Sequence, residues 1–227
     1  MIDKKRNIEI NERLRNLYKK YQKEYLSMYI QKFKDPDPPQ RINEFGIIDA
    51  ERYDTDNGIL FIAKETHGWS NEDYSNGIFF RSWLKDMTEH GLHGHASRHP
   101  LMWYNLGRWA SLLNNPSQDI SKLAEIKSIS EIGTLAFTNI NKVRGESSSG
   151  SAYQNLAHAD ITGCLLRKEI DIIQPKTIVC CGTYQEFIRH VDFNGKVIEM
   201  PHPGARIKTK VMLNKLSEQL KQYDSNS

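Results

Sequence analysis

The sequence predicts an α/β fold: three layers, α/β/α, around a central four-stranded parallel sheet, with an N-terminal helical appendage. Three observations favour this class. Four segments rich in apolar residues have the length of strands, and the first of them, residues 59–63, is apolar throughout, as in a strand that is buried on both faces. Amphipathic stretches of helical length separate these runs, which suits the crossover connections of a parallel sheet. The length of 227 residues fits one such domain and an appendage.

The N-terminal helix is expected over residues 11–33, where apolar side chains recur at spacings of three and four. Its aromatic stripe should pack on the body of the protein. The Asp-Pro-Asp-Pro-Pro run at residues 35–39 ends the helix, because proline lacks an amide donor and disfavours helix in the residue before it. We therefore expect residues 1–40 to form the helix and a proline-rich linker, and residues 41–227 to form the α/β/α domain.

Strands and helices of the domain are expected to alternate along the chain. The strands are expected at residues 59–63, 135–140, 177–181 and 196–200. The helices are expected near residues 78–90, 103–114, 152–173, 184–191 and 208–223. The serine-rich stretch at residues 147–151 is interpreted as a loop.

The composition excludes several classes of protein. Apolar residues make up 38% of the chain, which is too much for a disordered protein. No stretch approaches the ~20 consecutive apolar residues of a membrane-spanning helix, and the charged N-terminus is no secretory signal. The three cysteines, Cys164, Cys180 and Cys181, cannot form a disulfide framework. We therefore expect a cytoplasmic, monomeric protein that does not bind membranes.

The net charge of +3 is distributed unevenly. Residues 1–34 hold ten basic and four acidic residues, so the rest of the chain is slightly acidic. A basic arm is either a nucleic-acid contact or a solvated helix face, and the charge alone favours the solvated face. A second basic cluster lies at residues 196–221, which hold six basic and two acidic residues.

Polar residues follow the predicted strands at their carboxyl ends, which is where open α/β sheets place their chemistry. In chain order these residues are Lys64, Glu65 and His67 after the first strand, Asn139 and Asn141 at the end of the second, Thr183 next to Gly182 after the third, and His202 after the fourth. Since the carboxyl ends of parallel strands meet at one edge of the sheet, we expect a carboxylate, carboxamides and two histidines to converge there.

Five segments, in this order, resemble motifs of the uracil-DNA glycosylase superfamily, over about residues 58–210. Ala63-Lys64-Glu65-Thr66-His67 stands in place of the family's Gly-x-Asp-Pro-Tyr-type turn. Gly77-Ile78-Phe79-Phe80 resembles the segment whose aromatic ring stacks on the extruded base. Residues 138–142 resemble the second-strand motif with its base-reading asparagine, and residues 175–182 resemble the third strand. His202-Pro203-Gly204 resembles the His-Pro-Ser motif that carries the catalytic histidine.

The resemblance implies hydrolysis of the bond between deoxyribose and a flipped damaged base, uracil by default, without a metal or organic cofactor. It implies that Glu65 positions water, that His202 stabilises the departing base, and that Asn139 reads the base edge, with Asn141 as the second choice. The remaining substrate residues it implies are Phe80 as the stacking ring, His67 against the 5-methyl group of thymine, and Gly68 beside it. The implied contacts to DNA phosphates are Lys142, Arg144, Arg206, Lys208 and Lys210.

The residue types suit this chemistry. A carboxylate stabilises an oxocarbenium-like sugar and orients water on the face opposite the base. A neutral imidazole donates a hydrogen bond to the carbonyl oxygen on which the departing base gathers negative charge. A carboxamide offers one acceptor and one donor, which matches uracil and mismatches cytosine. Asn139 and Asn141 are two residues apart in a strand, so both face the same side of the sheet.

Each role competes with an ordinary structural one. A carboxylate after a strand can cap the following turn, a histidine can order a proline-flanked loop, and an asparagine at a strand end can bond local backbone. Aromatic residues at helical spacing, such as Phe80, are more often part of the core. Charged loop residues are usually solvated.

The chain departs from the family's pattern at several positions. Glu65 replaces an aspartate, Thr66 and His67 replace the proline and tyrosine of the turn, and Gly204 replaces a serine. Arg206, followed by Ile207, stands where the family has an intercalating leucine. Two alternatives therefore remain: a catalytically silent nucleic-acid or nucleotide-binding module of the same fold, and a hydrolase that acts on nucleosides or modified nucleotides.

A cluster of histidines suggests a second site. His90, His93, His95 and His99 lie within ten residues, a density that suits zinc or another transition metal. However, the intervening glycines break a helix, so no His-x-x-x-His pair is expected on a helix, and the segment contains no cysteine. We therefore expect no metal there and interpret the segment as a loop over the active site. The adjacent Cys180 and Cys181 are interpreted as buried strand residues.

Overall fold

The computed structural model describes residues 2–33, 35, 37–67, 79–145 and 151–225. The helices are α1 (Lys4–Lys32), α3 (Phe80–His90), α4 (Pro100–Asn114), α5 (Ile120–Glu125), α6 (Ser151–Ala157), α7 (Asp160–Ile173), α8 (Tyr184–His190) and α9 (Thr209–Ser225). The strands are β1 (Gly46–Ile47), β2 (Ile59–Ala63), β3 (Thr66–His67), β4 (Ala136–Asn139), β5 (Arg144–Gly145), β6 (Thr177–Cys181) and β7 (Lys196–Met200). Short 3-10 helices lie at η1 (Thr55–Asn57), η2 (Gly94–Arg98) and η3 (Ser130–Thr134). The predicted α/β class is confirmed.

The main sheet has five strands in the order β1-β4-β2-β6-β7, so the expected sheet of four parallel strands is wrong in detail. The neighbouring strands β4, β2, β6 and β7 run parallel to one another, but β1 pairs with β4 in the antiparallel direction. β1 has two residues and therefore leaves no apolar run in the sequence. A side chain of α1 completes its outer edge, because the Asn11 carboxamide donates to the Ile47 carbonyl at 2.9 Å and accepts from the Ile47 amide at 2.9 Å.

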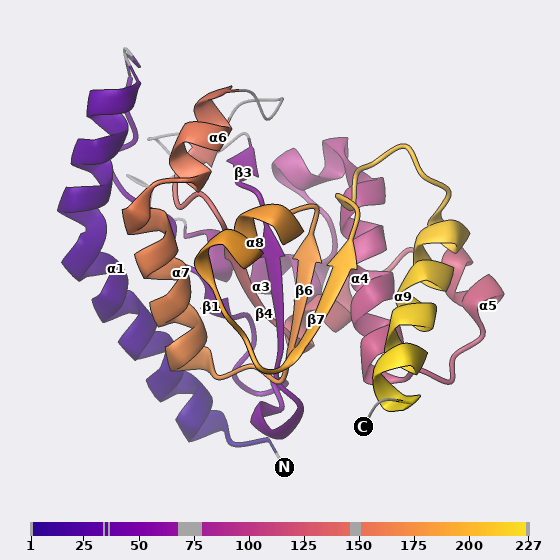
Figure 1. The fold of residues 1–227 in the computed structure, drawn as a ribbon. Coiled ribbons are helices and arrows are strands. Elements are labelled where there is room, and N and C mark those ends of the chain that lie inside the picture. The colour runs from indigo at the N-terminus through magenta and orange to yellow at the C-terminus, as the bar shows by residue number, and fades with distance from the viewer. Residues whose placement is uncertain (1, 34, 36, 68–78, 146–150, 226–227) are drawn as a thin grey trace.

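Helices cover both faces of the sheet (Figure 1). The chain leaves β2 toward β4 through α3, α4 and α5, and then crosses back over β2 to β6 through α7. Because such crossovers are right-handed, the two groups of helices lie on opposite faces, and Figure 1 shows α8 in front of the sheet and α3 behind it. The strand order thus reverses between β2 and β6. In open α/β sheets this switch point, at the carboxyl ends of the strands, is where ligands bind.

The centre of the sheet is the core of the protein. Leu60, Phe61 and Ile62 of β2 have no exposed surface, and Cys180 and Cys181 of β6 are buried in the same way. All three cysteines are free thiols. Because both faces of β2 and β6 are buried, their side chains form nearly continuous apolar runs, and these runs predicted the two strands from the sequence.

Helix α1 begins at Lys4, earlier than expected, and ends at Lys32 as the proline-rich run predicts. Its first turns use polar residues on the inner face, which hid them from the apolar pattern. Asn7 is completely buried and donates to the carbonyls of Ala50 at 2.9 Å and Tyr53 at 2.8 Å. Figure 1 shows α1 alongside α7 at the edge of the sheet. Within the part of the chain that is described, none of the helices is both long and apolar enough to cross a membrane.

The long helix expected near residues 152–173 is divided into α6 and α7. The break is stabilised by Thr162, whose buried hydroxyl donates to the Leu156 carbonyl at 2.8 Å. This division places Tyr153 of α6 beside the carboxyl ends of the strands, where its backbone contributes to the candidate site.

Candidate functional site

The residues that follow β2 and β4 are held next to each other beyond the ends of the strands. The Ile140 amide donates to the Ala63 carbonyl at 2.8 Å, and the Asn141 amide donates to the Lys64 carbonyl at 2.9 Å. Backbone hydrogen bonds between the two segments therefore continue past the ends of the strands. As a result Glu65 lies next to Asn141, at the carboxyl end of the strand that borders the switch point.

The Glu65 carboxylate is fixed by Asn141. The Asn141 Nδ2 donates to Glu65 Oε2 at 3.2 Å and to the Tyr153 carbonyl at 3.4 Å. Asn141 is completely buried, and its Oδ1 has no hydrogen-bond partner among the described residues. An unpartnered buried acceptor is costly, and a ligand N–H would satisfy it.

Gly145 of β5 leaves the space that the Glu65 side chain occupies. A Cβ at this position would collide with the Glu65 carboxyl group. β5 pairs in parallel with β3, so that Gly145 is opposite His67. The sequence interpretation missed Gly145, because nothing local to it indicates that Glu65 packs against it.

Asn139 is almost fully buried at the end of β4, and its carboxamide is fixed by Thr66. The Thr66 hydroxyl accepts from Asn139 Nδ2 at 3.0 Å and from Asn43 Nδ2 at 3.0 Å. Thr66 is one of the departures from the family's turn, and its hydroxyl orients two carboxamides. Asn43 lies between α1 and β1, so the segment that leads into the sheet also supports the candidate site.

His202 is half-buried after β7, and its ring is oriented by its own loop. The Gly204 amide donates to His202 Nδ1 at 3.1 Å, so in the neutral ring the proton is on Nε2. Burial lowers the pKa of His202, and the positive charge of Lys64 lowers it further. The neutral imidazole with an Nε2–H donor is therefore the favoured form.

Hydrogen bonds that involve α4 and the start of α9 hold the loop that carries His202 in place. The buried Asn105 of α4 donates to the Pro203 carbonyl at 2.8 Å, and its Oδ1 accepts from Arg108 at 3.0 Å and from the Thr209 hydroxyl at 3.1 Å. Gly182 follows β6 with a φ of +76°, and a Cβ there would lie 3.0 Å from the His202 amide nitrogen. Both residues position His202.

Lys64 is a site residue to which the sequence interpretation gave no role. It follows β2, and its Nζ lies 5.3 Å from the centre of the Tyr153 ring. β6 separates β2 from β7, so Lys64 and His202 are about two strand spacings, roughly 10 Å, apart. The ammonium thus lies on the same rim as the imidazole and next in the chain to the Glu65 carboxylate.

Replacing Lys64 by methionine is expected to raise the pKa of His202, because the charge that opposes protonation is removed while burial remains. The matched control is Lys196→Met, whose ammonium lies 5.3 Å from the Tyr223 ring at the start of β7, the opposite end of the sheet. NMR titration of the histidine ring signals measures the pKa. An unchanged pKa in Lys64→Met, or equal changes in the two variants, would contradict this arrangement.

The depressed pKa also fixes the sign of a stability change. As the pH falls below about 6.5, the ordinary value for histidine, the unfolded chain binds this proton before the folded protein does. His202 therefore reduces stability as the pH falls from that value to its lower folded pKa.

Phe80 does not lie open at the site as expected of a stacking ring. It is 4% exposed, and its ring packs against Phe45, Trp83 and Phe137 with centroid distances of 5.3, 5.7 and 5.6 Å. The ordinary explanation, an aromatic core residue at the start of α3, accounts for it.

The expected phosphate contacts divide into two groups. Lys142 has no exposed surface and forms an ion pair with Glu169, so it cannot reach a phosphate. Arg144 forms ion pairs with Asp35 at 3.4 Å and Asp37 at 3.3 Å. Its charge therefore stabilises the position of the proline-rich linker after α1. In contrast Arg206, Lys208 and Lys210 are exposed, and the Lys210 Nζ donates to the Ser121 hydroxyl at 3.0 Å.

The remaining expected residues belong to β3, lie in the histidine segment or fall outside the described residues. His67 belongs to β3, and Gly68 lies outside the described residues. In the histidine segment, His93 Nε2 lies 2.6 Å from Asp86 Oδ2, and His90 Nε2 lies 3.7 Å from Asp86 Oδ1. Over the described ranges, no group of three or more histidine, cysteine or acidic side chains is arranged to hold a metal ion.

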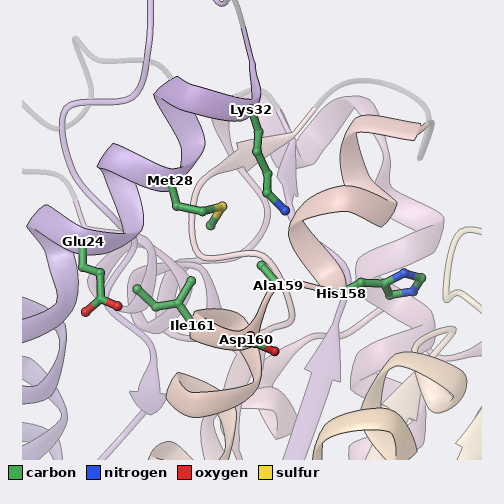
Figure 2. Close-up of a pocket in the computed structure, with 7 residues that line it drawn as sticks. All are labelled: Glu24, Met28, Lys32, His158, Ala159, Asp160 and Ile161. Atoms are coloured by element: carbon green, nitrogen blue, oxygen red, sulfur yellow. The ribbon is translucent and has the colours of Figure 1, made fainter.

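Two hollows in the surface lie away from the rim. Figure 2 shows one of them between α1 and the start of α7, where Met28 and Lys32 face Ala159 and Ile161 and where His158 points away. The other lies at the amino ends of β2, β6 and β7, between Ile59, Thr177 and Lys196. Neither is lined by Glu65, Asn139 or His202.

No protein-family model and no curated protein matches this chain.

Proposed function

We propose that this protein is a DNA glycosylase-like hydrolase that cleaves the N-glycosidic bond of a flipped damaged base, with uracil as the default base. The fold proposed for it is the three-layer α/β/α domain of a divergent uracil-DNA glycosylase. The observation that carries the proposal is the Glu65 carboxylate, held by Asn141 on the same strand-end rim as a neutral His202.

Glu65 is proposed to stabilise the sugar as it becomes oxocarbenium-like and to orient the attacking water. The hydrogen bond from Asn141 and the close fit against Gly145 support this role, because they hold the carboxylate in one place. A fixed carboxylate needs no reorganisation when positive charge develops on the sugar.

His202 is proposed to donate its Nε2–H to the carbonyl oxygen of the departing base. The Gly204 amide on Nδ1 and the lowered pKa support this assignment, since both favour the neutral ring with its proton on Nε2. The strength of such a bond rises as the base gathers negative charge, so it favours the transition state over the ground state.

Asn139 and Asn141 are proposed to read the base. The Asn139 carboxamide is held in one orientation by Thr66, which suits recognition of a fixed donor and acceptor pair. The buried Oδ1 of Asn141, with no partner among the described residues, supports a ligand that brings an N–H group. The edge of uracil brings one.

One observation favours a second candidate, a hydrolase acting on nucleosides or modified nucleotides. Lys142 and Arg144 are paired with carboxylates of the protein itself, so fewer cations of the expected set are available for a DNA backbone. An oligonucleotide with a single uracil, followed by alkali, is compared with free deoxyuridine. Scission of the oligonucleotide supports the glycosylase, and release of uracil only from the nucleoside supports the second candidate. Binding without release from either would leave the catalytically silent module.

The double substitution Arg206→Gln and Lys208→Gln is expected to weaken oligonucleotide binding and its salt dependence. If each residue neutralises one phosphate, the slope of log affinity against log salt falls by roughly 1.8 for duplex DNA or 1.4 for a single strand. Arg144→Gln is the matched control, because its guanidinium already pairs with Asp35 and Asp37. Titrations at several salt concentrations measure the slope. Equal losses in the double variant and the control would overturn the assignment.

A further inference from the structure

A completely buried ion pair lies next to Asn139, one of the two asparagines of the candidate site. Lys142 Nζ and Glu169 Oε2 are 2.7 Å apart, and neither side chain has exposed surface. An ammonium has three N–H donors, and all three are used. They donate to Glu169, to the Thr138 hydroxyl at 2.9 Å and to the Asn139 carbonyl. Lys142 therefore folds back onto the residue that carries a base-reading side chain.

Helix α1 completes this network. The Tyr18 hydroxyl donates to Glu169 Oε1 at 2.7 Å, and the Thr138 hydroxyl donates to Glu169 Oε2 at 3.0 Å. Burial and the neighbouring Glu169 raise the pKa of Tyr18, which keeps this hydroxyl a donor. The backbone of Lys142 is held as well, because its amide donates to the Tyr25 hydroxyl at 3.0 Å and its carbonyl accepts from the Asn43 amide at 2.7 Å.

Stability alone gives no reason for charges at this place. Well-packed apolar residues of similar volume often replace a buried ion pair without loss of stability. The charges instead constrain the orientation of the two side chains. The ammonium must point at the Asn139 carbonyl, and the carboxylate must face both Tyr18 and the ammonium. The backbone from Asn139 to Lys142 is thereby fixed, and with it the side chains of Asn139 and Asn141.

We propose that Lys142, Glu169 and Tyr18 are positioning residues that hold Asn139 and Asn141 in the orientation for reading the base and fixing Glu65. This inference rests on the proposed function for the identity of what is read. The orientation of the two asparagines can be measured without a substrate, so the two proposals fail separately.

The first test is the double variant Lys142→Met and Glu169→Leu, which replaces the pair by apolar side chains. We expect a folded protein in which hydrogen exchange of the Asn139 and Asn141 side-chain amides, followed by NMR, is at least tenfold faster. Uracil release should fall at least tenfold. A folded double variant with unchanged amide exchange would overturn the proposal, and so would a double variant that unfolds, because the pair would then act through stability.

The second test compares two buried tyrosines that each lose one hydroxyl. Tyr18→Phe removes the donor to Glu169, whereas Tyr53→Phe removes a buried hydroxyl that has no hydrogen-bond partner among the described residues. We expect faster amide exchange at Asn139 and Asn141, and slower uracil release, in Tyr18→Phe only. Equal behaviour of the two variants would overturn the proposal. If the unmodified protein releases no uracil, the proposed function fails, while amide exchange still decides whether these residues position the asparagines.

Discussion

Replacing Glu65 by glutamine is expected to slow base release by about 10²–10⁴-fold, the range typical of a positioned acid or base. Glutamine has the same shape, and its carbonyl oxygen can still accept from Asn141, so the fold is retained. What is lost is the negative charge that stabilises the sugar cation. Single-turnover release from an oligonucleotide with one uracil measures the rate. Glu51→Gln is the control, since Glu51 pairs with Lys4 at the protein surface.

Gly145→Ala tests the same carboxylate by a steric change. The added methyl group would displace the Glu65 side chain without removing its charge. We therefore expect a loss of activity that approaches that of Glu65→Gln. If both variants release base at the rate of the unmodified protein, Glu65 has no part in the chemistry.

Replacing Lys142 alone by methionine is expected to lower the free energy of unfolding by about 3–5 kcal/mol, because it leaves Glu169 as a buried charge without a counter-charge. For a chain of this length the loss corresponds to a fall in Tm on the order of 10 °C. Urea titration and thermal unfolding measure both quantities. The burial that lowers the pKa of Lys142 is opposed by Glu169, which keeps the ammonium charged while the pair is intact.

Two controls separate the charge effect from the loss of the side chain. Lys176→Met removes an exposed lysine and should leave the stability within about 0.5 kcal/mol of the unmodified protein. The double variant Lys142→Met and Glu169→Leu should recover most of the loss, since no buried charge remains. A single variant as stable as the unmodified protein would show that Glu169 is not charged when buried there.

The strands of the sheet were predictable where packing leaves a local trace. Residues 59–63, 177–181 and 196–200 are strands with the predicted ends, because these segments, rich in apolar residues, stop at turn residues. β1 left no trace, since two residues carry no pattern and the Asn11 side chain satisfies its edge. The first turns of α1 were missed for a related reason: their inner face buries Asn7, a polar residue.

For the candidate site, the sequence indicated a position at the ends of the strands but not the contacts of every residue there. The rule that chemistry lies after parallel strands led to Glu65, Asn139, Asn141 and His202. Lys142 looked like a loop cation, because its partner Glu169 is 27 positions further along the chain. Arg144 was misassigned in the same way, since its partners lie more than 100 positions earlier. Contacts between residues so far apart in the chain have no signature in a local motif.

The most direct measurement is the release of free uracil from an oligonucleotide with one uracil, by the unmodified protein and Glu65→Gln side by side. If the proposed chemistry is right, the unmodified protein releases uracil and leaves an alkali-labile site, and Glu65→Gln does so about 10²–10⁴-fold more slowly. An oligonucleotide that stays intact with the unmodified protein, or equal rates for the two proteins, would contradict it.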